Sequence, residues 1–229
     1  MFGVMTAWAA ASSPVADLAS LSWPTVASLA TAAGTLVLAV ATFAAVRSSN
    51  RSARIAEVAL EEQRRPVLVQ SRLDDPAQKI MFLGGHWVHV SGSGGVAEHV
   101  DGVVYLAMSL RNVGAGIGVL QGWTVRAGLL TSQDEHSTEP EFRRQTRDLY
   151  IPPGDIGLWQ GALRDPADHV HSAIVDAAEQ RETISVELLY TDQVGGQRTI
   201  SRFNLVPVGD DAWLTSSGRH WYLDQANPR

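Results

Sequence analysis

An uncharged apolar stretch from Trp23 to Val46 constrains this chain more than any other feature. An α-helix rises about 1.5 Å per residue, so about 20 apolar residues cross a hydrocarbon core that is about 30 Å thick. Trp23 suits the boundary between lipid and water, and Pro24 suits the first turn of a helix, where its missing N–H is not needed. The sequence therefore predicts a transmembrane helix over residues 23–46. The alternative is a buried helix of a soluble protein.

The charges on the two sides of this stretch predict its orientation. No Lys or Arg precedes it, which argues against a secretory signal peptide because such a peptide begins with a positive region. Within about 20 residues after it come five arginines: Arg47, Arg51, Arg54, Arg64 and Arg65. Because Lys and Arg concentrate on the cytoplasmic side of membrane helices, we expect a single-pass protein of the cell inner (plasma) membrane. Its short tail, residues 1–22, is predicted outside and its C-terminal domain in the cytoplasm.

Residues 47–65 predict a juxtamembrane helical stalk. Small apolar residues alternate there with Arg and Glu, and the stretch ends before Pro66, since the residue before a proline avoids the α region. Arg47, Arg51 and Arg54 have i, i+4, i+7 spacing and share one helix face, where anionic headgroups would stabilise each by about 1 kcal/mol. They are therefore predicted, with Trp23, to mark the membrane interface. The simpler reading is that they are only the positive-inside signal.

Small residues within the apolar stretch predict packing of the span. Ala30 and Gly34 are four residues apart, so they share one face, where a second helix can approach closely. The expected contacts are the lipid bilayer and either a protein partner or a weak homo-oligomer formed through the span. Alternatively, the Ala content reflects only the composition of the genome.

From residue 66 onward, short strand patterns separated by Gly, Pro and Asp replace the helical pattern. Residues 102–112 are apolar on both faces, which favours a central strand. Further strands are predicted at 66–73, 119–130, 183–190, 198–206, 212–216 and 218–224, one or two strands at 79–90, and loops at 91–101 and 131–148. Asp165 as N-cap and Pro166 as first residue predict one helix over 166–180. The sequence therefore predicts a mainly β chain, with a β-sandwich domain over 66–229 that carries one inserted helix.

A glycine-rich turn, RNVGAGIG, follows the predicted central strand. Asn112 can form an Asx turn, and Gly114 and Gly116 permit a positive φ or a close backbone approach. We expect one of these two glycines to take a positive φ. A phosphate-binding loop is the alternative, but neither a helix nor a Lys-Ser/Thr pair follows it.

A second glycine pair, Gly195-Gly196, predicts the turn of a hairpin between residues 183–190 and 198–206. A calcium loop around Asp192 is the alternative, but it lacks acidic ligands at alternate positions.

The sequence assembles no catalytic or metal site. There is no cysteine, so a thiolate ligand or nucleophile is excluded. His86 and His89 are three apart on a predicted strand and face opposite sides, and His99 beside Glu98 and Asp101 would form only a weak site. No Gly-x-Ser-x-Gly elbow occurs. We therefore predict a non-enzymatic protein with no catalytic residue, cofactor or bound metal.

The charge balance argues against nucleic-acid binding. The net charge is −6, and the part after the apolar stretch carries 23 acidic and 18 basic residues, a net charge of −5. Nucleic-acid binding requires a basic face. The basic run Arg143, Arg144 and Arg147 is flanked by Glu139 and Glu141, which indicates a solvated loop. A membrane-facing or anion-binding loop is the alternative.

The segments LRNVGAGIG (110–118), PPGD (152–155) and LLYTDQVGGQR (188–198), with Arg65-Pro66 at the end of the stalk, carry a resemblance. In them the chain resembles a loose group of uncharacterised bacterial single-span membrane proteins. The resemblance implies an immunoglobulin-like β-sandwich after the span and stalk, and it carries over no active site. The helix predicted over 166–180 departs from a plain sandwich.

Two functions agree with this layout. The first is a membrane-anchored, non-catalytic interaction or scaffold protein that presents a cytoplasmic β-sandwich to a protein partner. The second is a membrane-tethered sensor or carrier that binds a small ligand, with Trp87, Trp123, Trp159 and Trp221 lining part of a pocket, although Trp more often packs a core. An apolar cavity with convergent polar groups would favour the ligand, and an exposed apolar patch over a filled core would favour the partner.

Overall fold

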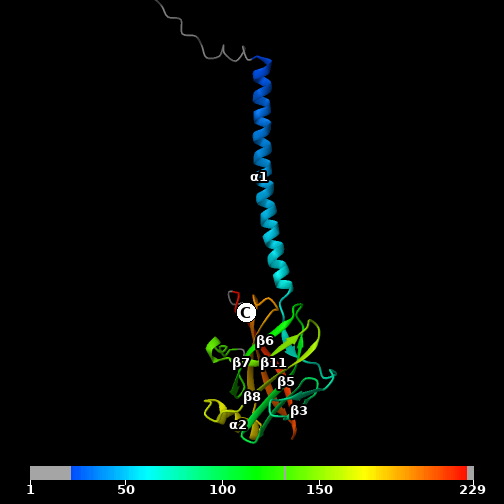
Figure 1. Ribbon diagram of the computed structural model, residues 1–229, viewed down its shortest axis with the longest axis vertical. Coiled ribbons are helices and arrows are strands. Elements are labelled where there is room, and N and C mark those ends of the chain that lie inside the picture. The colour runs from blue at the N-terminus through cyan, green and yellow to red at the C-terminus, as the bar shows by residue number, and fades with distance from the viewer. Residues whose placement is uncertain (1–21, 132, 226–229) are drawn as a thin grey trace, which may run out of the picture. The chain divides into compact units, whose positions relative to one another are not determined.

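The computed structural model describes residues 22–131 and 133–225 and divides the chain into two compact units, the second beginning at Ala59 (Figure 1). The boundary lies inside helix α1, Trp23–Gln63. This uninterrupted helix starts at the predicted Trp23 and ends before Pro66, as the proline requires. Among the described residues, α1 is the one helix long and apolar enough to cross a membrane. Apart from Ser22, the predicted N-terminal tail lies outside the described residues.

The second unit is built mainly of strands. In the described residues they are β1 (Leu68–Gln70), β2 (Gln78–Met81), β3 (Trp87–Val90), β4 (Gly94–Val100), β5 (Val103–Asn112), β6 (Gly118–Ala127), β7 (Arg143–Ile151), β8 (Ile156–Leu163), β9 (Ile184–Thr191), β10 (Arg198–Val208) and β11 (Ala212–Tyr222). A short 3-10 helix, η2 (Glu139–Glu141), precedes β7, and α2 (His171–Glu179) lies between β8 and β9. The predicted mainly β class is confirmed.

One antiparallel sheet contains nine of these strands. Its path is β1-β5-β4-β11-β10-β9-β6-β7, and β8 pairs with β5; β2 and β3 form a separate hairpin. The sheet curls until β7 and β8 contact each other, and there Gln145 Nε2 donates to the Gln160 carbonyl over 3.2 Å. No β-ladder joins the described residues of β7 and β8, so this contact is an open seam. An immunoglobulin-like sandwich has two sheets, and that finer description stays a prediction.

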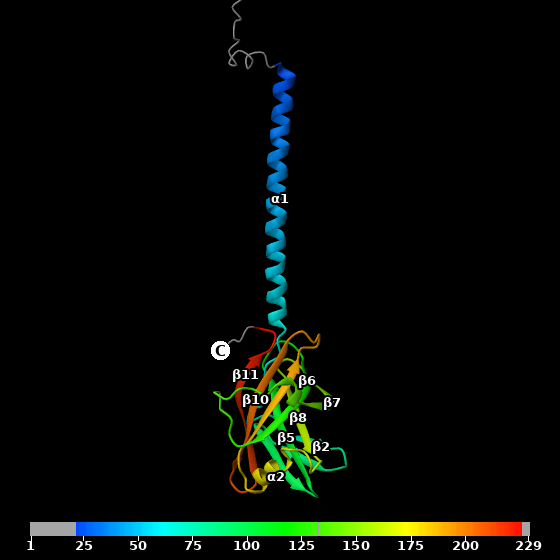
Figure 2. The same cartoon turned by 90° about the vertical axis from the view of Figure 1, so that its left-hand side faces the viewer.

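The core fills the inside of the curled sheet. Its largest fully buried side chains include Trp159, Tyr190 and Phe203, and α2 contributes Ile174 and Ala177. Both views show α2 at one end of the β domain (Figure 1, Figure 2), where it contacts β4, β5, β6 and β9. The hairpin β2–β3 packs on the outer face of β5, so β5 is buried on both faces, as its sequence predicts.

Two segments that the sequence predicts as loops form strands. Residues 91–101 contain β4, where Gly95 packs closely: a Cβ there would lie 2.4 Å from Leu205 Cδ2, and the leucine would have to move. Residues 131–148 contain the first part of β7, which starts at Arg143. β7 ends the path of the sheet, so only one of its edges is paired by a ladder, and charged side chains are typical of such an edge strand.

Two other boundaries also differ from the sequence prediction. The two strands predicted at 212–216 and 218–224 are one strand, β11, which runs through an irregularity: Gly218 lies near the Arg202 carbonyl, where the pairing register with β10 shifts between Ser201 and Phe203. The predicted helix 166–180 starts only at His171, and Asp165 accepts from Ala167 N in the turn before it.

Candidate functional site

A cleft of about 410 Å³ opens at the seam between β7 and β8. Its apolar lining comes from the β2–β3 turn, from β6 and from β8. The described lining residues include four arginines and no acid: Phe82, Leu83, Trp123, Arg143, Arg144, Thr146, Arg147, Gln160, Gly161, Ala162 and Arg164. The cleft therefore combines a strongly basic wall with an apolar floor.

One of the four arginines is already neutralised. Arg143 donates to both carboxylate oxygens of Asp168, each over 2.7 Å, and its guanidinium lies 5.3 Å from the ring centre of Trp123. Partial burial raises the pKa of Asp168, but hydrogen bonds from Arg143 and from Val170 N outweigh this and hold the pKa below its usual value. Asp168 is therefore ionised at neutral pH, and it holds Arg143 in place against Trp123.

The other arginines are available to an anion. The side chains of Arg144 and Arg147 are exposed and have no hydrogen-bond or ion-pair partner among the described residues. Arg164 donates one N–H to the Leu83 carbonyl and lies 5.6 Å from the ring centre of Tyr105. Although the chain as a whole is acidic, this local concentration of positive charge attracts anions to the cleft.

A buried amide lies in the wall between these arginines. Gln160 is 9% exposed, and its Oε1 has no hydrogen-bond partner among the described residues. Across the seam, Gln145 Oε1 is buried and unpartnered as well. Most buried polar atoms in proteins are hydrogen-bonded, and an unpaired one costs about 1–3 kcal/mol. Of these two amides only Gln160 lines the cleft, so it is the one to which a bound molecule can supply a partner.

The predicted Asx turn is confirmed. Asn112 is fully buried, and its Oδ1 accepts from Gly114 N over 3.0 Å and from Val67 N over 3.2 Å. Its Nδ2 donates to the carbonyls of Gly116 and Ile151. One side chain thus ties three segments of the domain together.

The expected positive φ at Gly114 or Gly116 is wrong, because neither is among the positive-φ glycines of the described residues. Close approach of another backbone segment explains instead why glycine occupies both positions. A Cβ on Gly116 would lie 1.6 Å from the Arg64 carbonyl oxygen, and one on Gly114 would lie 2.3 Å from the Arg65 carbonyl oxygen.

The second glycine turn forms the predicted hairpin. Gly195 has a φ of +86° and, with Gly196, lies between β9 and β10. Asp192 accepts from Gln197 N over 3.0 Å, so its carboxylate closes the turn.

The predicted tryptophan pocket does not form as a unit. Trp123 and Trp159 pack edge to face with ring centres 5.4 Å apart, and of the four tryptophans only Trp123 lines the cleft. Trp87 is half exposed on β3, and Trp221 lies against the guanidinium of Arg202.

Two of the histidines considered as metal ligands each pair with a single carboxylate. His86 lies 3.0 Å from Glu98, and His99 lies 2.8 Å from Glu179. Within the described residues, no group of three or more His, Asp or Glu could hold a metal ion.

The predicted membrane-facing residues lie on α1. Trp23, Arg47, Arg51 and Arg54 are exposed on this helix, as are the span-packing residues Ala30 and Gly34. Their contacts with lipid or a second helix stay predictions. Arg65, which the sequence groups with the basic flank, is only 6% exposed and pairs with Asp224 over 2.7 Å. It is therefore a structural residue of the β domain.

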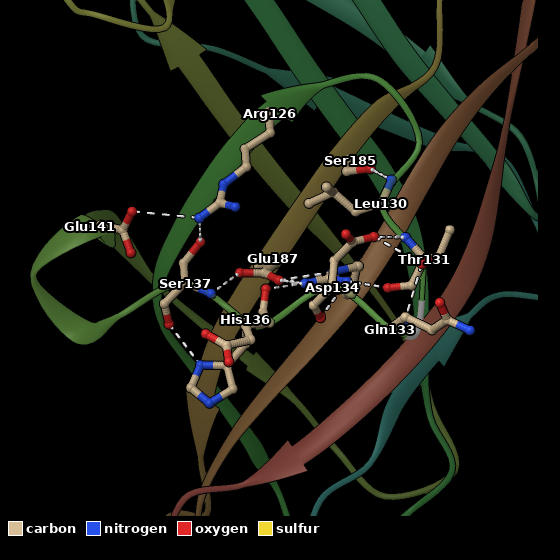
Figure 3. Close-up of polar contacts among 12 residues, drawn as sticks. Arg126, Leu130, Thr131, Gln133, Asp134, His136, Ser137, Glu141, Ser185 and Glu187 are labelled. Atoms are coloured by element: carbon tan, nitrogen blue, oxygen red, sulfur yellow. Dashed lines mark hydrogen bonds and ion pairs between the residues drawn. The ribbon is translucent and has the colours of Figure 1, made fainter.

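Sequence reasoning missed a buried ion pair between β9 and β10. Arg202 and Glu187 are 1% and 3% exposed and lie 2.6 Å apart. All five N–H groups of Arg202 are used: two donate to Glu187 Oε1, and three to the carbonyls of Thr131, Asp134 and Glu135. Glu187 Oε2 accepts from Ser137 N over 2.8 Å. Figure 3 shows Glu187 among Thr131, Asp134 and Ser137, so the pair fixes the loop after β6.

A buried serine and a partly buried histidine also meet. Ser201 Oγ lies 2.6 Å from His220 Nδ1 and 2.8 Å from Tyr190 Oη. Burial raises the pKa of Tyr190 to about 12 and lowers the pKa of His220, so both are neutral at pH 7. Ser201 is fully buried, so its hydroxyl has no exposed face from which to attack a substrate.

No protein-family model, curated protein or solved structure matches this chain.

Proposed function

We propose that this protein is a single-pass membrane protein whose cytoplasmic β domain is a non-catalytic binding domain, a sensor or carrier for a small anionic ligand. The cleft at the β7–β8 seam is the observation that carries the proposal. Its volume of about 410 Å³ falls within the range of small-molecule pockets, about 300–1,000 Å³. It also has the expected composition, an apolar floor with a few convergent polar groups.

The helix α1 supports the membrane anchor. Its large apolar side chains at Leu36, Val37, Leu38 and Phe43 are exposed, and a lipid environment would cover them. Ala30 and Gly34, which are exposed and four residues apart on α1, support close approach of a second helix and weak self-association. The immunoglobulin-like fold and the resemblance to bacterial single-span proteins belong to the same proposal, supported by the antiparallel sheet after the apolar helix.

A protein partner is the second candidate function, and the hairpin β2–β3 favours it. Met81 and Trp87 are cross-strand neighbours, and both side chains are about half exposed. Lys79 lies 4.7 Å from the ring centre of Trp87. An exposed apolar pair beside a cation is the kind of surface that protein partners use.

The orientation is tested by fusing reporters after Arg229. A reporter active only after export is expected to be silent, and one active only in the cytoplasm is expected to work. The physical reason is that Arg47, Arg51 and Arg54 stay on the cytoplasmic side. Strong activity of the export reporter would contradict this orientation.

Anion binding is tested with 4-fluorophenyl phosphate and the full-length chain in an uncharged detergent. Binding is measured by ¹⁹F NMR, and only the part that unlabelled phenyl phosphate displaces is counted. This binding is expected to weaken at least tenfold in the double variant Arg144→Gln/Arg147→Gln. Arg72→Gln, an exposed arginine that does not line the cleft, is the control and should bind as the wild type does. An affinity that the double substitution leaves unchanged, or no binding at all, would rule out the proposed site.

A further inference from the structure

We propose that the ligand of the β7–β8 cleft is an amphiphilic anion, a phosphate or carboxylate joined to an apolar group. This inference rests on the proposed function and assigns the chemistry of the ligand. Neither a bare inorganic ion nor an uncharged apolar molecule would use both halves of the cleft.

The anionic half of the ligand meets Arg144 and Arg147. Arg143 donates from Nε and Nη2 to Asp168, which neutralises its charge, so it shapes the wall rather than attracting the ligand. A planar guanidinium presents paired N–H donors that match two oxygens of a phosphate or carboxylate. Arg164 reinforces the positive charge while its hydrogen bond to the Leu83 carbonyl holds it in place.

The apolar half of the ligand meets the floor. Phe82 and Trp123 are buried side chains that line the cleft, and Leu83 is 66% exposed at its rim. A Cβ at residue 161 would lie 2.7 Å from Trp159 and 3.1 Å from Trp123, so a larger residue there would displace the tryptophan rings. Because Gly161 has no side chain, β8 leaves space in the cleft beside Trp123. An apolar group placed here covers Leu83, which an inorganic ion would leave in water.

Gln160 sets the position of the ligand between the two halves. Its unpartnered amide lines the cleft, and rotation of the amide exchanges Oε1 and Nε2, so it can accept from or donate to a ligand. Such a polar group beside an apolar floor fixes the orientation of a ligand rather than its total affinity.

The test compares three probes on the full-length chain in an uncharged detergent. 4-Fluorophenyl phosphate has both halves, inorganic phosphate only the anion, and 4-fluorophenol only the ring. Affinities come from ¹⁹F NMR titration and, for inorganic phosphate, from competition. We expect 4-fluorophenyl phosphate to bind at least tenfold more tightly than inorganic phosphate, and 4-fluorophenol to show no displaceable binding.

Two leucine variants separate the halves. Leu83→Ser is expected to weaken the binding of 4-fluorophenyl phosphate at least threefold and to leave the binding of inorganic phosphate unchanged. Leu73→Ser is the matched control, since Leu73 is 75% exposed and lies outside the cleft, and it should change the binding of neither phosphate. Near-ultraviolet circular dichroism of each variant verifies that the β domain is folded.

The outcomes distinguish this inference from the proposed function. Equal affinity for the two phosphates, with both lost in Arg144→Gln/Arg147→Gln, would keep an anion site and overturn the amphiphilic ligand. If that double variant still binds both phosphates as the wild type does, the amphiphilic ligand and the proposed anion site are both overturned.

The natural source of the amphiphilic anion is identified in lipid nanodiscs. If phosphatidic acid in the disc displaces 4-fluorophenyl phosphate and phosphatidylcholine does not, the ligand is a membrane lipid. If neither lipid displaces it, the ligand is a soluble compound of the same chemistry. Displacement by phosphatidylcholine to the same extent would show that the negative charge does not matter, which would overturn the inference.

Discussion

Replacing Arg202 by Met is expected to destabilise the β domain by about 3–5 kcal/mol, because it leaves the carboxylate of Glu187 buried without its cation. The carbonyls of Thr131, Asp134 and Glu135 lose their donors at the same time. The free energy of unfolding is measured by urea titration of the full-length chain in an uncharged detergent, followed by near-ultraviolet circular dichroism.

Arg198→Met is the matched control. Arg198 also pairs with a glutamate, Glu139, but both side chains are partly exposed, and exposed ion pairs contribute little to stability. Arg202→Met should also increase proteolytic cleavage within residues 133–137, whose loop the pair holds. Equal unfolding midpoints for the two variants would show that the buried pair does not support the domain.

Gly116→Ala is expected to destabilise the β domain by about 3 kcal/mol, the upper part of the range for overpacking. The new Cβ would lie 1.6 Å from the Arg64 carbonyl oxygen, so the turn and the segment before β1 must separate. Asn112 then loses hydrogen bonds on both sides of the gap, to Val67 N and to the Gly116 carbonyl. The same urea titration measures the loss.

Gly196→Ala is the control for this substitution. Gly196 lies in an exposed turn without a positive φ, and a Cβ there would meet nothing within 4 Å. Its replacement is expected to leave stability unchanged or to raise it by about 0.4–1 kcal/mol, because alanine restricts the unfolded chain. A Gly116→Ala protein as stable as Gly196→Ala would refute the close-approach explanation.

Local patterns predicted the features that depend on neighbouring residues. The length and ending of α1, the two buried faces of β5 and the turn at Gly195-Gly196 each follow from a short window of sequence. The Asx turn at Asn112 was predictable for the same reason, since its first partner is Gly114, two residues away.

The cleft and the ion pair could not be predicted in this way, because their partners are distant in the chain. Arg143 meets Asp168 and Gln145 meets Gln160 only because the sheet curls until its edges touch. In the sequence, Arg143 and its neighbours look like a charged loop. The glycines were misread for a related reason: Gly116 is required by the Arg64 backbone, which no local pattern reveals.

The position of β11 in the sheet sets the order in which this domain can be completed during synthesis. Among the described residues β11 alone joins β4 to β10 by ladder hydrogen bonds, so before it is made β4 and β10 each have an unpaired edge. Ribosomes add roughly 5–20 residues per second, so the edge of β4 stays unpaired for several seconds until β11 has been synthesised. Unpaired edges recruit other strands, and the newly made chain is therefore most prone to aggregation in this interval.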